Sequence, residues 1–559
     1  MSKGLLITGT ACIALFNLSN ALAVNNIPAG VEPGVLGRQL TQEPFRPRLK
    51  PAQIQSTITE SGKPIPGAEK IKFLLKKLII EGNKSLSYDQ LLPIFKDKLN
   101  KTISVADLQA ITKSISASYR KAGYLISVAI IPPQEIANGA VKIKVIEGFV
   151  DHISVEGNPS YANRKLLIAY AKRIQKSNPL KSSVLERYAL LADDMPGTNV
   201  RFILAPSKKT QGAADLKLVV NQHPISIYAS TDNHADRNLG RVEGFTGGFI
   251  NGAFQGGKIG LQSAYNDKFW FVEFRNEQQV GSDGLDWDTS YSLLESTPNL
   301  DSLGESYDFN FDGQYSSFRT RLSYPIIRSR RNNLWVYGQF DTIDSNTDLI
   351  TQNLFEDHIR SLRGGIDYEN VDSWQGVNIV GVDFAQGLRS LGADSPLPSR
   401  PNGKLNYSKF DGFISRLQHL PKRLSALLSL SGQYSFDSLL SAEQFTFGGI
   451  EYGRGYDPAT LIGDQGIEGK AELRYTTPGI PGFIRYIQFF GFYDAGEIWN
   501  RDDLGQIPTA YATSVGAGVR ISFAHTLYAQ VEFGQPIRAT TGIDKGNHVY
   551  FTLAANLFD

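Results

Sequence analysis

Several features that would place this chain in a common class are missing. Cysteine occurs once in 559 residues, at Cys12. No segment reaches the roughly 18 consecutive apolar residues that a membrane-spanning helix needs. If the chain crosses a bilayer, it must therefore do so as a closed β-barrel, which satisfies every backbone hydrogen bond in lipid. The formal net charge is only +2, which argues against a dedicated nucleic-acid binder.

Catalytic signatures are missing as well. The chain contains neither GxSxG nor HExxH. Residues 252–258 fit the pattern GxxxxGK, but Ile259 stands where a phosphate-binding loop needs Ser or Thr to hold magnesium. The histidines are scattered without the spacing of metal ligands; they are His152, His223, His234, His358, His419, His525 and His548. We therefore predict no enzyme activity, no cofactor and no metal site.

The first 23 residues predict a cleavable secretory signal. They combine Lys3, an apolar run over residues 5–16 and the sequence Ala-Leu-Ala at 21–23. Cleavage there removes Cys12 and leaves a mature chain without cysteine, which suits an oxidising compartment. The alternative is a lipoprotein modified at Cys12, but the apolar run before that residue is too short. Residues 24–69 are rich in Pro, Gly, Gln and Ser and predict a linker with one short helix around 35–40.

Two successive segments, residues 70–148 and 149–222, repeat the order strand, helix, helix, strand, strand. Ser104 is typical of a helix N-cap in the first of them. The expected elements of the first are a strand at 73–81, helices from Ser87 and from Ser104, and strands at 124–131 and 140–147. Those of the second are a strand at 150–157, helices at 162–174 and 183–192, and strands at 200–205 and 214–221. Small α/β modules with exposed sheet edges can accept an extra strand from an unfolded peptide; the alternative role is that of rigid spacers.

From residue 223 to 559 the pattern changes to strand alternation. Near the C-terminus Val549, Phe551 and Leu553 alternate with polar or small neighbours, as lipid outside and water inside demand. The alternative is a soluble β-sandwich. Against it stand the number of strands and aromatic residues near expected strand ends, at Trp270, Phe271, Phe489 and Phe490. About 335 residues at roughly 20 per strand and connection predict about 16 antiparallel strands, and such a barrel has a lumen wide enough for an extended chain.

One loop within this region carries an unusual charge. Arg454 lies between two glycines and is followed by Tyr456, and a strand-like segment follows at 466–475. Further on, Phe492, Asp494 and Gly496 fall at every second position and so on one strand face. An acid on an inward face is costly unless a cation meets it, so we predict that Arg454 pairs with Asp494. Taken alone, an arginine in a Gly-rich loop is usually a solvated charge.

The Gly-Arg-Gly-Tyr loop followed by a Phe-x-Asp-x-Gly strand resembles the signature of the TpsB transporters of two-partner secretion. These export haemolysins and filamentous adhesins. Residues 70–148 resemble the first POTRA domain of that family, and segment 196–206 matches a further pattern. The resemblance implies a sixteen-stranded barrel, an N-terminal helix that plugs it, and a lock between loop and wall formed by Arg454, Gly455, Tyr456, Phe492, Asp494 and Gly496. This chain departs from the family at Gly453, which is more often Val, and at Asp559, which follows the usual terminal aromatic residue.

The resemblance also implies a location and partners. The barrel is expected in the bacterial outer membrane and the POTRA domains in the periplasm. The expected partners are an unfolded TpsA-type exoprotein, either an adhesin or a haemolysin, the lipid of the outer membrane and the machinery that assembles barrels. The alternatives are a barrel-assembly factor of the same superfamily, an outer-membrane enzyme that modifies a toxin, and a simple porin. A porin does not need the about 150 residues of periplasmic modules.

Overall fold

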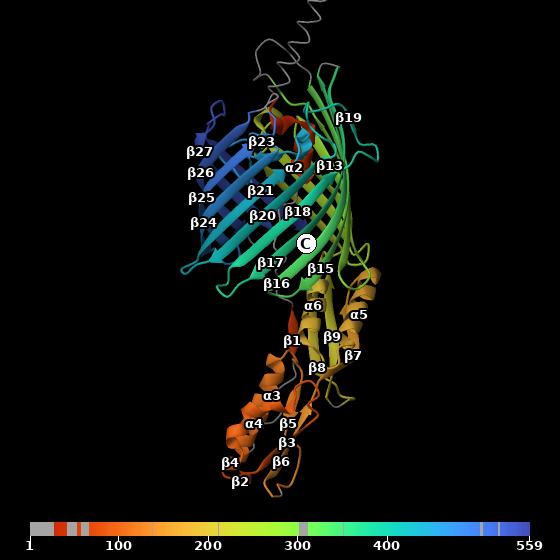
Figure 1. Cartoon of the computed structure of the whole chain (residues 1–559), viewed down its shortest axis with the longest axis vertical. Coiled ribbons are helices and arrows are strands. Elements are labelled where there is room, and N and C mark those ends of the chain that lie inside the picture. Colours follow the sequence, from red (N-terminus) through yellow and green to blue (C-terminus); the bar gives the residue numbers. More distant parts are fainter. Residues whose placement is uncertain are drawn as a thin grey trace, which may run out of the picture.

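The computed structural model describes residues 27–41, 53–56, 66–136, 138–210, 212–300, 311–349, 352–502, 507–523 and 526–558. The predicted signal segment, with Cys12, lies outside these residues, and so does Asp559. Two small modules hang from one end of a large barrel (Figure 1). No described helix is long and apolar enough to span a bilayer.

The first module contains two small sheets and one long helix. The long helix α4 follows from sequence, because Ser104 and Asp107 form a capping box at its start and apolar residues at helical spacing are buried beneath it. The elements are β2 (Lys72–Leu75), β3 (Lys77–Glu81), α3 (Tyr88–Leu91), the 3-10 turns η2 (Leu92–Ile94) and η3 (Lys96–Lys98), β4 (Lys101–Ser104), α4 (Val105–Lys121), β5 (Val128–Ile130) and β6 (Ala140–Ile146).

Three expectations for this module were wrong in detail. The strand predicted over 73–81 is two strands, interrupted at Lys76, because β2 pairs with β4 while β3 pairs with β6. The helix predicted from Ser87 is a single turn followed by 3-10 turns. The strand predicted over 124–131 forms only at 128–130, because the N–H of Tyr124 bonds instead to the carbonyl oxygen of Tyr119 at the end of α4.

The second module is a four-stranded sheet covered by two helices. Its elements are β7 (Phe149–Gly157), α5 (Tyr161–Gln175), α6 (Ser182–Asp193), β8 (Thr198–Pro206) and β9 (Ala213–Gln222). The fourth strand, β1 (Ile54–Ser56), comes from the predicted linker and pairs in parallel with β8. Nothing in the composition of the linker indicated this strand. Ile126 of the first module is buried in the core of the second, so the two modules share packing.

The barrel has sixteen antiparallel strands and closes by pairing its first strand with its last, which confirms the predicted fold and count. A short additional strand, β19 (Asp394–Leu397), pairs with β17 at the end away from the modules. The sixteen strands are β10 (Ile225–Asp232), β11 (Glu243–Asn251), β12 (Lys258–Tyr265), β13 (Phe269–Val280), β14 (Leu285–Ser296), β15 (Phe311–Arg328), β16 (Asn332–Leu349), β17 (Gln352–Val371), β18 (Val377–Gly387), β20 (Ser408–His419), β21 (Leu424–Ser435), β24 (Gln465–Pro478), β25 (Ile484–Trp499), β26 (Thr509–Phe523), β27 (Leu527–Ala539) and β28 (His548–Phe558).

Alternation along the strands separates an apolar outer wall from a charged lumen. Leu428, for example, is 56% exposed on the outside, while acids such as Glu369 and Asp494 are buried on the inside. The four aromatic residues expected together near strand ends divide between these two faces. Trp270 and Phe489 point outward, whereas their neighbours Phe271 and Phe490 are buried in the lumen.

Two elements lie inside the barrel. The helix α2 (Pro33–Thr41), close to the predicted helix at 35–40, packs against the inner faces of strands β13 to β16 (Figure 1). A Cβ atom at Gly37 would lie 2.5 Å from the ring of Tyr315, so the glycine lets the helix press directly on the wall. The second element is a hairpin of β22 (Phe445–Phe447) and β23 (Leu461–Gly463), preceded by the turn η6 (Ser441–Glu443).

Candidate functional site

The tip of the internal hairpin, residues 448–460, holds the predicted loop. Its backbone folds back tightly with positive φ at Gly448, Gly449 and Gly453, a conformation that favours glycine. The ring of Phe447 lies 2.7 Å from where a Cβ atom at Gly453 would stand. The valine that the family more often has would therefore not fit this loop without a shift of that ring.

The loop presents Arg454 to the wall of the barrel, where the side chain is almost completely buried. Its backbone N–H and its Nε both donate to Oδ2 of Asp494, at 3.0 and 2.9 Å, and its Nη2 donates to Oδ1 at 2.8 Å. The guanidinium carbon lies 3.6 Å from the centre of the Phe492 ring. Charge-assisted bonds of this fork geometry fix orientation as well as position.

The other residues of the predicted site surround this pair. Phe492, Asp494 and Gly496 lie on the inward face of β25, and the ring of Phe447 fills the space that a side chain at Gly496 would need. A Cβ atom at Gly455 would lie 2.6 Å from that of Ser514, so the loop touches the wall here too. The hydroxyl of Tyr456 lies 3.0 Å from the carbonyl oxygens of Thr513 and Arg538 on β26 and β27. The structure brings all six predicted residues together.

Glu472 is a further member of the site that the sequence did not reveal. It accepts from Arg454 Nη1 at 2.7 Å, from Arg474 Nε at 2.6 Å and from Arg520 Nη1 at 2.6 Å. Alternation along 466–475 places Glu472 on the polar face, but Arg520 reaches it only because β24, β25 and β26 are neighbours in the barrel. No local pattern could have supplied this partner.

Asp457, three residues after Arg454, makes a second attachment that the sequence analysis missed. Arg237 Nε and Arg241 Nη1 each donate to its carboxylate at 2.7 Å, and His548 Nε2 lies 3.2 Å from it. The two arginines belong to the connection between β10 and β11, while His548 begins β28. Asp457 therefore links the loop to both sides of the pairing that closes the barrel.

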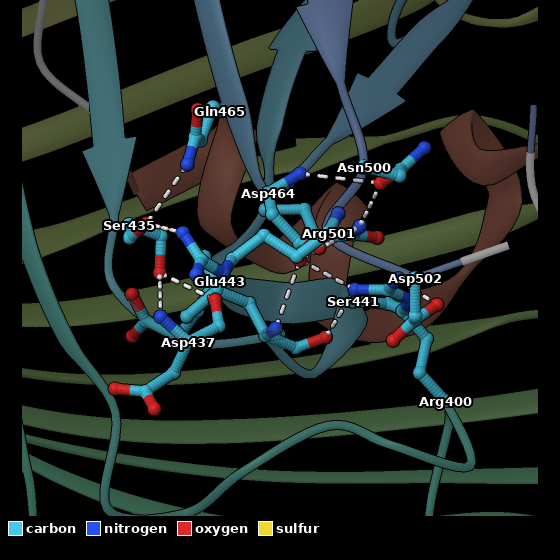
Figure 2. A network of polar contacts seen from close by, with 12 residues as sticks. Arg400, Ser435, Asp437, Ser441, Glu443, Asp464, Gln465, Asn500, Arg501 and Asp502 are labelled. Carbon is cyan, nitrogen blue, oxygen red and sulfur yellow. Dashed lines mark hydrogen bonds and ion pairs between the residues drawn. The ribbon is translucent and has the colours of Figure 1, made fainter. Parts of the chain in front are cut away.

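A further polar network attaches the base of the hairpin (Figure 2). Glu443 of η6 is fully buried, and it accepts from Arg363 Nη2 and Lys409 Nζ at 2.7 and 2.9 Å. Arg400 Nη1 bonds to Asp464 beside β23 at 2.5 Å, and its Nη2 bonds to Asp502 at 3.0 Å. The helix α2 joins this network through Arg38, whose guanidinium donates to the carbonyl oxygen of Gln444. The hairpin and the helix are thus held to the wall by side-chain contacts. Both lie inside the barrel, but neither is part of the sheet that forms it.

A closed sixteen-stranded barrel with paired α/β modules at one end and a charged loop locked in its lumen defines a class, the modular outer-membrane transporters. Residues 73–148 match the family described as POTRA domain, ShlB-type. Residues 285–521 match the family described as Haemolysin secretion/activation protein ShlB/FhaC/HecB. The first module and most of the barrel are thus similar to this family.

Known relatives align over most of the chain. The Heme/hemopexin transporter protein HuxB of Haemophilus influenzae (strain 86-028NP) is 25% identical over 543 residues, which cover 93% of this chain and 94% of the relative. The Outer membrane transporter CdiB of Dickeya dadantii is 21% identical and covers 78% of each. In structure, CdiB from Escherichia coli superimposes with a TM-score of 0.71 at 17% identity over the full length of both chains; this likeness shows the fold.

These relatives place the protein in the outer membrane with its POTRA modules in the periplasm, as predicted. The relatives are named as transporters, which favours the translocator over the barrel-assembly factor. BamA from Haemophilus ducreyi, lacking POTRA domains 1–3, shares the fold with a TM-score of 0.53 at 14% identity. That likeness shows the fold and carries no functional argument.

Proposed function

We propose that this transporter binds an unfolded TpsA-type exoprotein, an adhesin or a haemolysin, and passes it through the barrel to the cell surface. Residues 70–148 and 149–222 serve as receiving modules and residues 223–559 as the conduit. One observation supports the proposal: the lumen holds a helix of the same chain, α2, that packs against the wall and is not part of the barrel sheet. The plug helix α2 is attached through contacts such as that of Arg38 with Gln444 and belongs to no barrel strand, so it can leave without breaking the barrel.

The edge of the second module offers a receiving site for the client. β1 occupies this edge in parallel with β8, with Ile54 opposite Phe202 and Ser56 opposite Leu204. β1 follows α2 in the chain, so a movement of the plug helix can draw β1 off the edge. An extended client segment can then pair with β8 in its place. Arrival of the client and release of the plug are thereby coupled.

The lock at Arg454 has the complementary role of holding the loop against the wall during this exchange. Its contacts reach β24 through Glu472, β25 through Asp494, and β26 and β27 through Tyr456. The transport cycle makes and breaks no covalent bond, and folding of the client outside the cell supplies the driving force. The client thus leaves chemically unmodified.

A deletion strain tests this function. The gene is removed from a strain that carries the large exoprotein encoded in the neighbouring reading frame. The exoprotein in the culture medium and the amounts of unrelated outer-membrane barrels are then measured. Export should be lost and restored by the full chain, while growth and the other barrels stay unchanged. A general loss of barrels would instead indicate an assembly factor. If the deletion strain still exports the exoprotein, and the exported protein has the mass of its unmodified form, the result would indicate a modifying enzyme.

A further inference from the structure

The outer wall of the barrel carries an apolar groove across β20, β21, β24 and β25, strands that lie side by side (Figure 1). Its volume is about 410 Å³, within the range of roughly 300–1,000 Å³ of ligand sites. Gly469 and Ala471 form its floor, and Leu428, Leu430 and Tyr493 form its sides. The floor is low because Gly469 and Ala471 on β24, and Ala495 opposite Gly469 on β25, are small. They lie between Leu428 and Leu430 on β21 and Tyr493 on β25.

One end of the groove is charged. Arg416 lines it and pairs across the sheet with Leu428. Nη1 of Arg416 donates to Oδ2 of Asp372 at 2.6 Å. The guanidinium also lies 5.9 Å from the ring centre of Trp374, which is 77% exposed. A cation, an anion and an exposed indole thus meet where the apolar surface ends.

This charged end lies at the periplasmic side of the bilayer. The turn between β15 and β16 contacts the second module, since the N–H of Arg330 bonds to Glu186 at 2.8 Å. The next turn at the same end, residues 372–376 between β17 and β18, contains Asp372 and Trp374. Exposed tryptophan is typical of a membrane–water interface, so the pair stands at the head groups of the inner leaflet.

A row of outward-facing polar side chains marks the same level. The Nδ2 of Asn370 donates to Oδ1 of Asn332 at 2.6 Å, and Arg416 Nη1 bonds to Oδ1 of Asn378 at 2.5 Å. Polar groups on the outer wall of a barrel are costly within hydrocarbon. The row therefore lies at the interface, and the groove extends from it toward the membrane interior.

We propose that the groove binds one phosphatidylethanolamine molecule of the inner leaflet. Its phosphate lies at Arg416, its ammonium group at Asp372, and one acyl chain lies over Gly469 and Ala471. The head group is a neutral zwitterion and the protein offers a matching ion pair, so both charges are met. An anionic head group carries no ammonium group. Its negative phosphate would therefore lie near the Asp372 carboxylate with no lipid cation to pair with that carboxylate. This site is independent of the client and of the plug.

Native mass spectrometry of the full chain tests the site. The protein is purified in detergent, stripped of lipid, and titrated separately with phosphatidylethanolamine and phosphatidylglycerol. One copy of phosphatidylethanolamine should bind at least tenfold more tightly than further copies and than phosphatidylglycerol. Binding of several equivalent copies would overturn the proposal, since lipids would then coat the wall without a specific site. A preference for phosphatidylglycerol would also overturn it, since the lipid would then bind to the exposed basic turns.

Paired variants separate the groove from the rest of the wall. Gly469→Val fills the floor, and its Cβ makes only ordinary contacts of 3.4–3.5 Å; the first copy should bind at least tenfold more weakly. Gly338→Val is the control, because that glycine lies on the exposed face of β16 with no atom within 4 Å. Arg416→Ala should weaken binding similarly, with the exposed Arg485→Ala as control, and Asp372→Asn should abolish the lipid preference. Wild-type binding by folded Gly469→Val and Arg416→Ala barrels would refute the site.

Discussion

At the residue scale, the loop is held by one buried cation shared between two acids. The side chain of Arg454 is 4% exposed, and those of Glu472 and Asp494 are 2% and 0% exposed. Taking three charges out of water is costly, and their attraction offsets the cost only while every partner is present. Removing one member of such a group typically costs about 3–5 kcal/mol, because an uncompensated charge stays buried.

Arg454→Ala should therefore detach the loop, and Arg454→Lys should rescue it only in part, because an ammonium cannot reproduce the fork. The measurement is hydrogen exchange at the amides of residues 448–460. The control is Lys142→Ala, which removes an exposed pair with Glu81 in the first module and should change little. Equal protection in the alanine and wild-type proteins would contradict a lock at this residue.

A site residue could be predicted only where a local sequence pattern marks it. Arg454 and Asp494 belong to two local patterns, a charge within a Gly-rich loop and an acid on a strand face, and each pattern needs the other. Glu472 and Asp457 have no such signal, because their cations Arg520 and Arg237 come from strands and connections placed beside them only when the barrel closes. Sequence reasoning thus gives the pair but not the network.

At the element scale, the plug helix is shaped to rest on the wall. Gly34 and Gly37 lie one turn apart, against Ala442 and Ser345 in one case and against the Tyr315 ring in the other. Glycine costs helix stability by about 1 kcal/mol relative to alanine, so two glycines in nine residues favour a helix that depends on its contacts with the barrel. The sequence of the predicted linker indicated the helix but not the inner barrel surface on which the helix packs.

Gly37→Val should displace the plug helix, because its Cβ would overlap the Tyr315 ring. We expect a higher and more persistent ion conductance of the purified chain in planar bilayers. Gln39→Val is the control for adding a valine elsewhere in the helix, since Gln39 is only partly buried, and it should conduct like the wild type. A Gly37→Val protein that stays as closed as the wild type would show that α2 does not seal the lumen.

The cap of α4 makes a pH-dependent contribution to the first module. The backbone N–H and hydroxyl of Ser104, and then Lys98, bond to the Asp107 carboxylate and lower its pKa from 3.8 to about 2. A lowered pKa means that the stabilisation is fully present above the unfolded value and disappears as the pH falls through about 2. Asp107→Asn should therefore weaken α4 at neutral pH.

Hydrogen exchange of the α4 amides in the full chain measures this effect. The difference between Asp107→Asn and wild type should be constant from pH 7 down to about pH 5 and shrink as the pH approaches 2, after correction for intrinsic exchange rates. A difference that does not depend on pH would show that the cap acts through shape alone. Asp97→Asn, a substitution of a nearby acid in η3, is the control.

At the scale of the whole molecule, the second module is fixed to one part of the barrel rim. Arg328, whose side chain is fully buried, donates to both oxygens of Asp194 at 2.8 and 2.6 Å. Arg173 and Tyr188 meet Asp283 at 2.8 and 3.0 Å. The order of elements predicted the modules and the barrel, whereas this docking depends on turns that sequence patterns leave undetermined. A client bound at the edge of β8 is thereby held beside the barrel mouth.

The central claim is that the plug helix must leave its place on the wall during export. A reversible cross-link tests it most directly. A Cβ atom at Gly34 would lie 3.5 Å from that of Ser345 on β16, within the range of about 3.5–4.5 Å for disulfides. An Ala442→Gly change, present in all variants of the test, removes the Cβ atom that would otherwise lie 2.9 Å away. Cys12 is the only cysteine of the sequence, so a Gly34→Cys, Ser345→Cys chain can form this bond without competition once the predicted signal is removed.

The measurement is the amount of exoprotein secreted by cells with the double variant, under oxidising conditions and after addition of a reductant. Each single-cysteine variant serves as control. Our account predicts that the cross-linked transporter exports less than a tenth of the wild-type amount and that reduction restores export. Undiminished export by a fully cross-linked transporter would contradict it.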